Sequence, residues 1–380
     1  MKIYFFGADY PPTGGGIATY SYEWIQSTAM HDEVEVIEVL IFGNRNPRSE
    51  SLGKKVAVIT LRNIGFLYVG YKVFSSFWKN RDYDIFHSFN LFPVGFWVTF
   101  WGKIFRKKTC VAFYGTDACD TSASVKTFLL KKWTLRNVSL PITISDFTKR
   151  ATEKRYSLGS DRIKVIYPVV PQALLFGTKS AEEDREIFKI KKTYNISDNT
   201  FVIISVCRLV KRKGVEYLIR AVAEIRDKDI RLLIIGDGPE KDNLINLVNI
   251  LDIRDRVFIL GKVKDIIPFY RIGSVSTLVS YNLVDDGDFE GLGLVLLEAQ
   301  SYGVPVIGTR SGGVPEAFEE NTTGLLVFPQ DVKALENAVR MMIDDREMRD
   351  RLAENTHSFL ERRFGFKNTI GRYIELCKSL

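Results

Sequence analysis

Phe201-Val-Ile-Ile-Ser-Val206 is followed directly by Cys207-Arg-Leu-Val-Lys-Arg-Lys-Gly214. An apolar run of this length is typical of a strand that is covered on both faces of a parallel sheet. The basic turn comes where the strand ends, and the carboxyl ends of strands in an open α/β sheet line its ligand crevice. This stretch therefore predicts a doubly wound domain whose crevice carries several cations, although spacing alone allows a solvated basic turn equally well.

Short apolar strands alternate with amphipathic helices on both sides of this stretch. Strands this apolar need helices on both faces, so the alternation favours parallel sheets. We predict an α/β fold class, with two Rossmann-like doubly wound domains and a ligand crevice between them. The predicted strands are residues 2–6, 34–40, 56–61, 84–89, 109–114, 140–145, 201–206, 231–236, 257–260, 275–280, 305–308 and 325–328.

A break separates two series of strands. Tyr167-Pro-Val-Val-Pro171 ends a strand, and a charged stretch without strands continues to about residue 199. A chain of 380 residues is also long for a single core. We therefore predict an N-terminal domain at residues 1–170 and a C-terminal domain at residues 171–361. The last helix, about residues 362–380, could dock on either domain.

Composition narrows the class of protein. Hydrophobic residues make up 46% and charged residues 26%, as in a globular domain. The four cysteines lack Cys-x-x-Cys spacing, so we expect neither a zinc site nor a disulfide frame, and a reducing cytoplasm fits best. The apolar start, residues 1–7, is too short for a signal peptide and is interpreted as a strand. Residues 85–102 carry no charge but are interpreted as a buried strand and helix, not a membrane span.

The positive charge lies in the first half of the chain. Residues 1–160 hold 21 Lys and Arg against 13 Asp and Glu, a balance of +8, whereas the whole chain has +7. This asymmetry indicates an anionic partner: a membrane surface, an anionic acceptor or nucleic acid. No nucleic-acid-binding motif accompanies it, so we expect no nucleic acid partner.

The strongest chemical motif is Glu290-Gly-Leu-Gly-Leu-Val-Leu-Leu-Glu298. Gly291 and Gly293 open a predicted helix, whose free N–H groups and dipole suit a phosphate. The two carboxylates around that point suit hydroxyl recognition, because ionised oxygens accept hydrogen bonds from sugar O–H groups. A capping acid and a solvated acid would explain either Glu alone, but not both around Gly-x-Gly.

Three further motifs are weaker. Pro11-Pro-Thr-Gly-Gly-Gly16 follows the first strand and lets the backbone approach a ligand, or is simply a flexible turn. Gly236-Asp-Gly-Pro-Glu240 fails the dinucleotide pattern because Lys241 replaces its last glycine. Asp286-Gly-Asp288 resembles a metal-binding pair, but such a triplet arises easily by chance, so we predict no metal site and no cofactor.

Together these residues resemble the retaining glycosyltransferases of family 4, which have the two-domain GT-B fold. The resemblance covers nearly the whole chain and is strongest over residues 206–329, which include Ser311-Gly-Gly-Val-Pro-Glu316 and Thr323-Gly-Leu-Leu-Val327. Glu-x7-Glu combined with Arg-x4-Lys-Gly is highly specific. The form of the motif at Glu290 is similar to the branch that contains phosphatidylinositol mannosyltransferases.

The resemblance implies a role for each site residue. Glu290 would hold donor-sugar hydroxyls, Glu298 the ribose, and Arg208 with Lys213 the diphosphate. Backbone groups at Gly293, Leu294, Val295, Gly15 and Gly16 would assist. Tyr114-Gly-Thr-Asp117 stands where the family usually has His-Gly-x-Asp, so Tyr114 puts the sugar identity and the activity in doubt. In such enzymes the front domain faces the acceptor, the second domain binds the nucleotide-sugar, and the last helix crosses back to the front domain.

The sequence thus predicts a metal-independent retaining hexosyltransferase that acts in cell-surface polysaccharide or glycolipid synthesis. Its donor would be a nucleotide-sugar such as GDP-mannose or a UDP-hexose, and its acceptor a glycan or a lipid-linked glycan. A sugar-nucleotide epimerase and a non-catalytic nucleotide-sugar-binding subunit remain alternatives. We expect a cytoplasmic protein, peripheral on the inner face of the cell membrane. Two aromatic and basic stretches, residues 66–81 and 126–136, are candidates for that contact, although their aromatic side chains could equally pack on the sheet.

Overall fold

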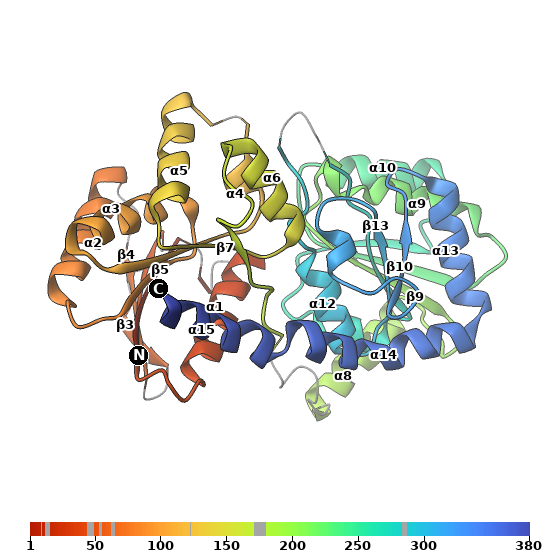
Figure 1. Cartoon of the computed structure of the whole chain (residues 1–380). Helices are drawn as coiled ribbons and strands as arrows, with labels where there is room; N and C mark the ends of the chain where they lie inside the picture. Colours follow the sequence, from red (N-terminus) through yellow and green to blue (C-terminus); the bar gives the residue numbers. More distant parts are fainter. Residues whose placement is uncertain are drawn as a thin grey trace. The chain divides into compact units, whose positions relative to one another are not determined.

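A computed structural model describes residues 1–8, 10–11, 16–43, 49–52, 55–61, 65–121, 123–170, 180–282 and 287–380. The chain divides into two compact units (Figure 1). The first unit comprises Met1–Pro171, Asp285–Gly291 and Phe364–Leu380, and the second comprises Gln172–Val284 and Leu292–Arg363. The short segment that includes Glu290 thus groups with the N-terminal part of the chain, although it lies inside the predicted C-terminal domain.

The sheet of the first unit has eight strands in the order β3-β4-β2-β1-β5-β6-β7-β8. All neighbours pair in parallel except β3 and β4, which are antiparallel. The antiparallel edge strand β3 was not among the predicted strands, and the two-residue β8 lies just before Tyr167, where a strand was predicted to end without stated bounds. The bounds are β1 Lys2–Gly7, β2 Val36–Phe42, β3 Ser49–Leu52, β4 Val56–Leu61, β5 Ile85–Ser88, β6 Lys108–Phe113, β7 Leu140–Thr143 and β8 Lys164–Val165.

Helices cover both faces of this sheet. On one face, Phe6 of β1 and Phe86 of β5 pack with Val73 and Phe77 of α2. On the other face lie α1 and the C-terminal helix α15, where Tyr373 Oη and His87 Nδ1 are hydrogen-bonded at 2.8 Å. The bounds are α1 Gly16–Ala29, α2 Phe66–Lys79, η1 Leu91–Gly95, α3 Phe96–Phe105, α4 Thr116–Cys119, α5 Val125–Asn137, α6 Asp146–Tyr156, η5 Lys367–Gly371 and α15 Arg372–Ser379.

The uncharged stretch at residues 85–102 forms β5, the η1 turn and most of α3. Its predicted interpretation as a buried strand and helix is therefore confirmed. Among the residues that the structure describes, no helix has the length and apolarity needed to cross a membrane.

The sheet of the second unit has six strands, all parallel, in the order β11-β10-β9-β12-β13-β14. The strand order reverses between β9 and β12, which is the topological switch point where open α/β sheets bind ligands. The strands are β9 Phe201–Val206, β10 Ile230–Ile235, β11 Val257–Gly261, β12 Val275–Leu278, β13 Val306–Thr309 and β14 Gly324–Val327. The helices are α8 Ala181–Thr193, η2 Lys211–Lys213, α9 Val215–Glu224, α10 Lys241–Ile250, α11 Ile267–Ile272, α12 Leu294–Ser301, η4 Val314–Glu316, α13 Val332–Asp344 and α14 Arg346–Phe364.

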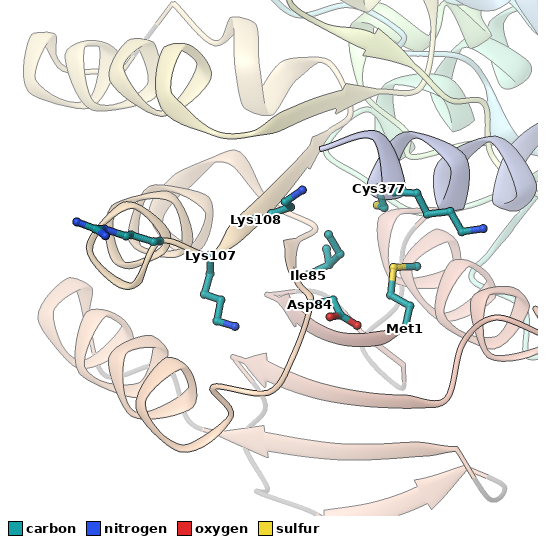
Figure 2. Close-up of a pocket in the computed structure, with 8 residues that line it drawn as sticks. Met1, Asp84, Ile85, Lys107, Lys108 and Cys377 are labelled. Atoms are coloured by element: carbon teal, nitrogen blue, oxygen red, sulfur yellow. The ribbon is translucent and has the colours of Figure 1, made fainter.

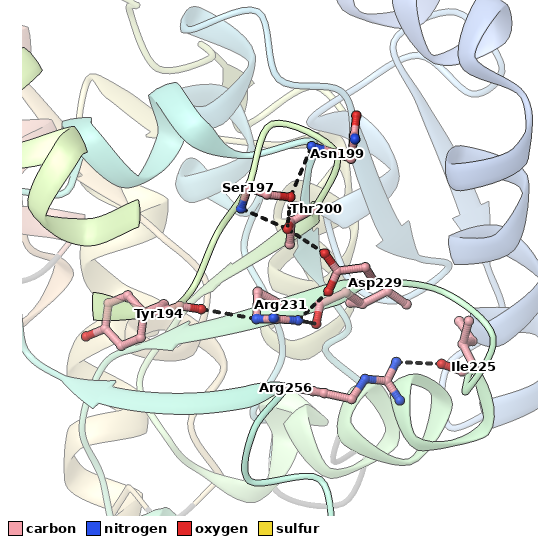
Figure 3. Close-up of polar contacts among 9 residues, drawn as sticks. Tyr194, Ser197, Asn199, Thr200, Ile225, Asp229, Arg231 and Arg256 are labelled. Carbon is pink, nitrogen blue, oxygen red and sulfur yellow. Dashed lines mark hydrogen bonds and ion pairs between the residues drawn. The ribbon is translucent and has the colours of Figure 1, made fainter. Parts of the chain in front are cut away.

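A polar network ties the amino ends of β9 and β10 together (Figure 3). Asp229 accepts hydrogen bonds from Thr200 Oγ1 and Arg231 Nη1, each at 2.6 Å. Arg231 Nε also donates to the carbonyl of Tyr194 at 3.1 Å. The hydrogen bond from Thr200 and the charge of Arg231 lower the pKa of Asp229. This network lies at the amino ends of two central strands, whereas open α/β sheets bind ligands at the carboxyl ends, so we interpret it as structural.

Candidate active site

Two loops of the second unit meet at its switch point. The loop after β9, Cys207–Gly214, lies beside the chain that leaves β12, and the N–H of Tyr281 donates to the carbonyl of Arg212 at 2.8 Å. Gly214 has a φ of +63°, and a Cβ there would lie 2.3 Å from the carbonyl oxygen of Val279. Only glycine therefore lets the two loops approach this closely.

The loop after β9 presents two predicted cations in different environments. Arg208 is exposed and forms no hydrogen bond or ion pair with any other described side chain, so its guanidinium is available to a ligand. Lys213 is only 9% exposed, which is rare for lysine. A free guanidinium and a buried ammonium at the carboxyl end of a central strand suit a polyphosphate.

The loop after β10, Gly236–Glu240, packs against the backbone of the basic loop that carries Arg208 and Lys213. The N–H of Leu209 donates to the carbonyl of Asp237 at 2.9 Å. A Cβ on Gly236, whose φ is +145°, would lie 1.8 Å from the carbonyl oxygen of Cys207. The Gly236–Glu240 turn is therefore a packing element beneath the basic loop, in agreement with its failure to match the dinucleotide pattern.

Helix α12 supplies backbone donors at the same switch point. Gly293 begins the helix with a φ of +96°, and a Cβ there would lie 2.8 Å from Leu278 of β12. The N–H groups of Leu294 and Val295 belong to the first turn, where an α-helix has no carbonyl acceptor for them. The prediction that a glycine opens this helix is confirmed for Gly293 but not for Gly291, which groups with the first unit. The first turn of the helix suits an anion.

Glu298 lies one turn further along α12 and is held by a residue that the sequence did not single out. Tyr270 of α11 donates its O–H to Glu298 Oε2 at 3.1 Å. Burial raises the pKa of Glu298, and the hydrogen bond from Tyr270 opposes that rise. Tyr270 itself is fully buried and stacks on Tyr302, with ring centroids 5.9 Å apart. No local pattern links Tyr270 to a carboxylate 28 positions later, so only the packing of α11 on α12 finds it.

Tyr114 and the segment that carries Glu290 meet within the first unit. A Cβ on Gly291 would lie 2.1 Å from the carbonyl oxygen of Tyr114, and one on Gly115 would lie 3.0 Å from Phe289. Asp117 accepts the N–H groups of Tyr114 and Gly115 at 2.9 and 3.0 Å, which fixes this turn. Tyr114 is buried against Tyr20 of α1, with ring centroids 5.0 Å apart, and Glu290 is half-buried.

The predicted site residues that the structure describes are divided between the two units. Arg208, Lys213, Gly293, Leu294, Val295 and Glu298 belong to the second unit, whereas Gly16, Tyr114 and Glu290 belong to the first. Gly16 is the exposed first residue of α1. Gly15 and Asp286 lie outside the described residues. Among the residues that are described, no group of three His, Cys, Asp or Glu side chains is arranged to hold a metal ion.

A cavity of about 410 Å³ lies elsewhere, at the amino ends of β1, β5 and β6 (Figure 2). Lys107 and Lys108 line it from the β6 side, and Cys377 lines it from α15. The amino ends of parallel strands are not where open α/β sheets bind their ligands. None of the predicted site residues lines this cavity, so it is not the candidate active site.

Comparison with known proteins agrees with the geometry. Residues 186–359 match the family model described as glycosyl transferases group 1, and residues 14–173 match that of glycosyltransferase family 4. The chain is 27% identical over 269 residues to N-acetyl-alpha-D-glucosaminyl L-malate synthase of Bacillus anthracis, which covers 70% of this chain and 67% of that protein. It is 35% identical over 161 residues to a GDP-mannose-dependent alpha-(1-6)-phosphatidylinositol monomannoside mannosyltransferase of Mycolicibacterium smegmatis, with 41% and 42% coverage.

The fold is similar to that of a solved structure over the full length of the chain. The HepE protein of Anabaena in complex with UDP-glucose superposes with a TM-score of 0.78 at 22% sequence identity, covering 100% of both chains. Each of the two units is built on its own α/β sheet, one of eight strands and one of six, as in a two-domain doubly wound protein. The chain belongs to glycosyltransferase family 4, with the GT-B fold. Its alignments span from two fifths to two thirds of the length of the two curated relatives above, so their activities extend to this chain only as a proposal.

Proposed function

We propose that this protein is a retaining glycosyltransferase that moves a hexose from a nucleotide-diphosphate sugar to an acceptor hydroxyl. The observation that carries the proposal is the grouping at the β9–β12 switch point. Arg208, whose side chain has no partner among the described residues, and the buried Lys213 lie in the loop after β9, which is hydrogen-bonded to the chain that leaves β12. The first turn of α12 begins at Gly293, which packs closely on Leu278 of β12. All three are positive, and all three suit a diphosphate.

The chemistry of glycosyl transfer makes use of this charge. The bond between the sugar and the diphosphate breaks as an oxocarbenium-like sugar forms, and negative charge grows on the leaving phosphate. Arg208, Lys213 and the N–H groups of α12 would stabilise that growing charge, so they would act most strongly in the transition state. In a same-face attack, the leaving phosphate oxygen accepts the proton of the acceptor hydroxyl.

The carboxylates would orient the donor. Glu298, held by Tyr270, would accept hydrogen bonds from the ribose hydroxyls. Glu290 would hold hydroxyls of the transferred sugar, and Tyr114 beside its segment would shape the space for that sugar. Glu298→Ala should therefore weaken binding of the bare nucleoside diphosphate, whereas Glu290→Ala should spare that binding and impair transfer.

The substrates proposed are a GDP-mannose or UDP-hexose donor and a glycan or lipid-linked acceptor in cell-surface polysaccharide or glycolipid synthesis. Two relatives support this range, since one is a GDP-mannose-dependent mannosyltransferase and another is a lipopolysaccharide core biosynthesis glycosyltransferase of Rhizobium meliloti. We place the protein in the cytoplasm, on the inner face of the membrane that would carry such an acceptor.

A donor screen by thermal shift tests the proposal first. A ligand that binds only the native state raises the melting temperature, so the correct nucleoside diphosphate should stabilise the protein. Arg208→Ala and Lys213→Ala should each lose charge-assisted hydrogen bonds worth about 1.5 to 3 kcal/mol. Transfer should slow by roughly tenfold to a hundredfold. Unchanged kinetics in both variants would refute the diphosphate site.

The two alternatives have their own outcomes. An epimerase would change the free sugar nucleotide in the absence of any acceptor. A non-catalytic subunit would bind the donor but show no turnover over a broad panel of acceptors. Tyr114, which replaces the usual histidine of the family, is the feature that favours this alternative.

A further inference from the structure

Three helices of the first unit, α2, α3 and α5, lie next to one another on the same side of its sheet. Phe66 of α2 packs on Trp97 of α3 with ring centroids 4.9 Å apart, and Phe96 of α3 packs on Trp133 of α5 at 5.5 Å. Trp97 Nε1 also donates to the carbonyl of Phe66 at 2.9 Å. The outer side of these three helices is called the α2–α3–α5 surface below.

The α2–α3–α5 surface carries cations without acids. The sequences of α2, α3 and α5 contain no Asp or Glu at all. None of their outer cations forms an ion pair with another described side chain. These cations are Lys72, Lys79, Lys103, Lys126, Lys132 and Arg136. A folded surface usually intersperses both signs, so a single-sign face of three helices indicates an anionic partner.

Large apolar side chains are exposed between these cations. On α2, Leu67, Tyr71 and Trp78 are 76%, 61% and 57% exposed, and their spacing of four and seven places them in one stripe. Val125 and Leu129 form a similar stripe on α5, at 76% and 56% exposed. The opposite side of α2 packs on the sheet through Val69, Val73 and Phe77. The exposed stripe is therefore not needed to form the core of the first unit.

The cations lie beside the exposed rings. Lys72 Nζ is 5.4 and 5.8 Å from the ring centroids of Tyr68 and Tyr71, and the guanidinium carbon of Arg81 is 4.2 Å from that of Trp78. In this arrangement an aromatic ring can enter the boundary of the acyl chains while the cation beside it stays at the level of the headgroups.

We propose that the α2–α3–α5 surface docks on an anionic lipid bilayer. The assignment rests on the proposed function in one respect, namely that a lipid-linked acceptor gives the enzyme a reason to be at a membrane. A bilayer fits better than a second copy of this chain, because two acid-free faces would repel each other. It fits better than an acidic protein because exposed Leu, Trp, Tyr and Val side chains gain most from an apolar phase.

The test is co-sedimentation of the full chain with vesicles of phosphatidylcholine alone and of phosphatidylcholine mixed with phosphatidylglycerol. Binding should require the anionic lipid and weaken as salt is added. Each neutralised cation should weaken binding about fivefold, so Lys79→Gln/Lys103→Gln/Lys126→Gln should weaken it roughly a hundredfold. The matched control, Lys154→Gln/Lys189→Gln/Lys192→Gln, removes three exposed lysines from elsewhere and should bind like wild type.

A second set of variants tests the contribution of the exposed apolar side chains to vesicle binding. Leu67→Ser/Tyr71→Ser/Trp78→Ser should lose vesicle binding, whereas Phe188→Ser/Ile250→Ser, which changes side chains 68% and 80% exposed in the second unit, should not. Trp78 fluorescence should shift to the blue on vesicles, and Trp78→Phe should remove that shift. Circular dichroism confirms that each variant is folded.

Three outcomes would overturn the proposal: no vesicle binding at low salt, equal binding to neutral vesicles, or a dimer that the surface variants dissociate. Binding of the nucleoside diphosphate by thermal shift keeps this result apart from the proposed function. If all surface variants bind the diphosphate normally while wild type ignores vesicles, only the membrane assignment fails.

Discussion

The hydrogen bond between Tyr270 and Glu298 joins two buried groups in the candidate site. Burial favours the neutral form of the carboxyl and raises its pKa, whereas the phenol O–H stabilises the ionised form. Hydroxyl recognition needs the ionised form, because it accepts hydrogen bonds through both oxygens. Tyr270 is therefore a positioning residue whose hydrogen bond favours the ionised form of Glu298.

Replacing Tyr270 by Phe should make donor binding more sensitive to acid. Loss of the O–H raises the pKa of Glu298 further, so affinity for UDP or GDP should be lost at a higher pH than in wild type. The measurement is nucleoside diphosphate affinity against pH, with the 2′-deoxy nucleotide as a second ligand. Tyr302→Phe keeps the stacked ring and removes a hydroxyl that forms no hydrogen bond with Glu298 within the described part of the chain, so it serves as the control. An unchanged pH profile together with unchanged discrimination against the deoxy ligand would refute this role.

At the residue scale, the sequence predicts features that depend on neighbouring positions in the chain. It misses contacts between residues that are far apart in sequence. Arg208 and Lys213 lie in the loop after a strand, and Gly293 opens a helix, so position along the chain was enough to predict where these residues lie in the fold. Tyr270 contacts Glu298 only because α11 and α12 pack together. The grouping of Glu290 with the first unit depends equally on contacts to Tyr114 and Gly115, which are far away in sequence.

At the scale of elements, the close contact between α2 and α3 depends on Gly70. A Cβ there would lie 2.6 Å from the ring of Trp97, and Trp101 Nε1 donates to the carbonyl of Gly70 at 3.0 Å. Gly70→Ala should destabilise the protein by about 1 to 3 kcal/mol through overpacking, which outweighs the gain in helix propensity. Urea unfolding measures this. Gly159→Ala, where a Cβ meets nothing within 4 Å, is the matched control, and equal effects at both sites would contradict the packing argument.

The docking of α15 depends on an uncharged histidine. His87 is fully buried against Tyr373, and burial lowers its pKa to about 3. In the unfolded chain histidine takes up a proton near pH 6.5. Stability from this group is therefore complete above about pH 6.5 and declines as the pH falls toward 3, with a slope of up to about 1.4 kcal/mol per pH unit.

Unfolding free energies of wild type and His87→Gln between these pH values test that slope. Wild type should lose stability more steeply with acid than the variant, and His31→Gln should behave like wild type. Parallel curves for wild type and His87→Gln would show that the histidine is not held neutral in the folded protein.

The strand pattern was predictable because the buried strands of a parallel sheet are mostly apolar. Residues 201–206 match β9 in full, and the other strands of the second sheet agree to within a few residues. Ser49–Leu52 and Lys164–Val165 are short and polar, so β3 and β8 have no apolar signature. They pair because longer strands beside them offer free backbone groups.

At the scale of the whole molecule, we expect sugar transfer to need no metal ion, because the candidate site has its own cations. Arg208, Lys213 and the first turn of α12 already supply positive charge for a leaving diphosphate. Activity should therefore survive treatment with EDTA, measured as transfer of labelled sugar before and after dialysis. Loss of activity that Mg²⁺ or Mn²⁺ restores would contradict this expectation and would direct attention to Asp288 and Asp286.

The central claim is that this member of family 4 transfers a sugar with retention of configuration. The most direct measurement is the anomeric configuration of the product, determined by NMR after reaction of wild type with its best-binding nucleotide-sugar and a glycan or lipid-linked acceptor. We predict transfer that depends on Arg208 and gives a product with the same anomeric configuration as the donor. An inverted product, or a donor that binds and is never transferred to any acceptor, would contradict it.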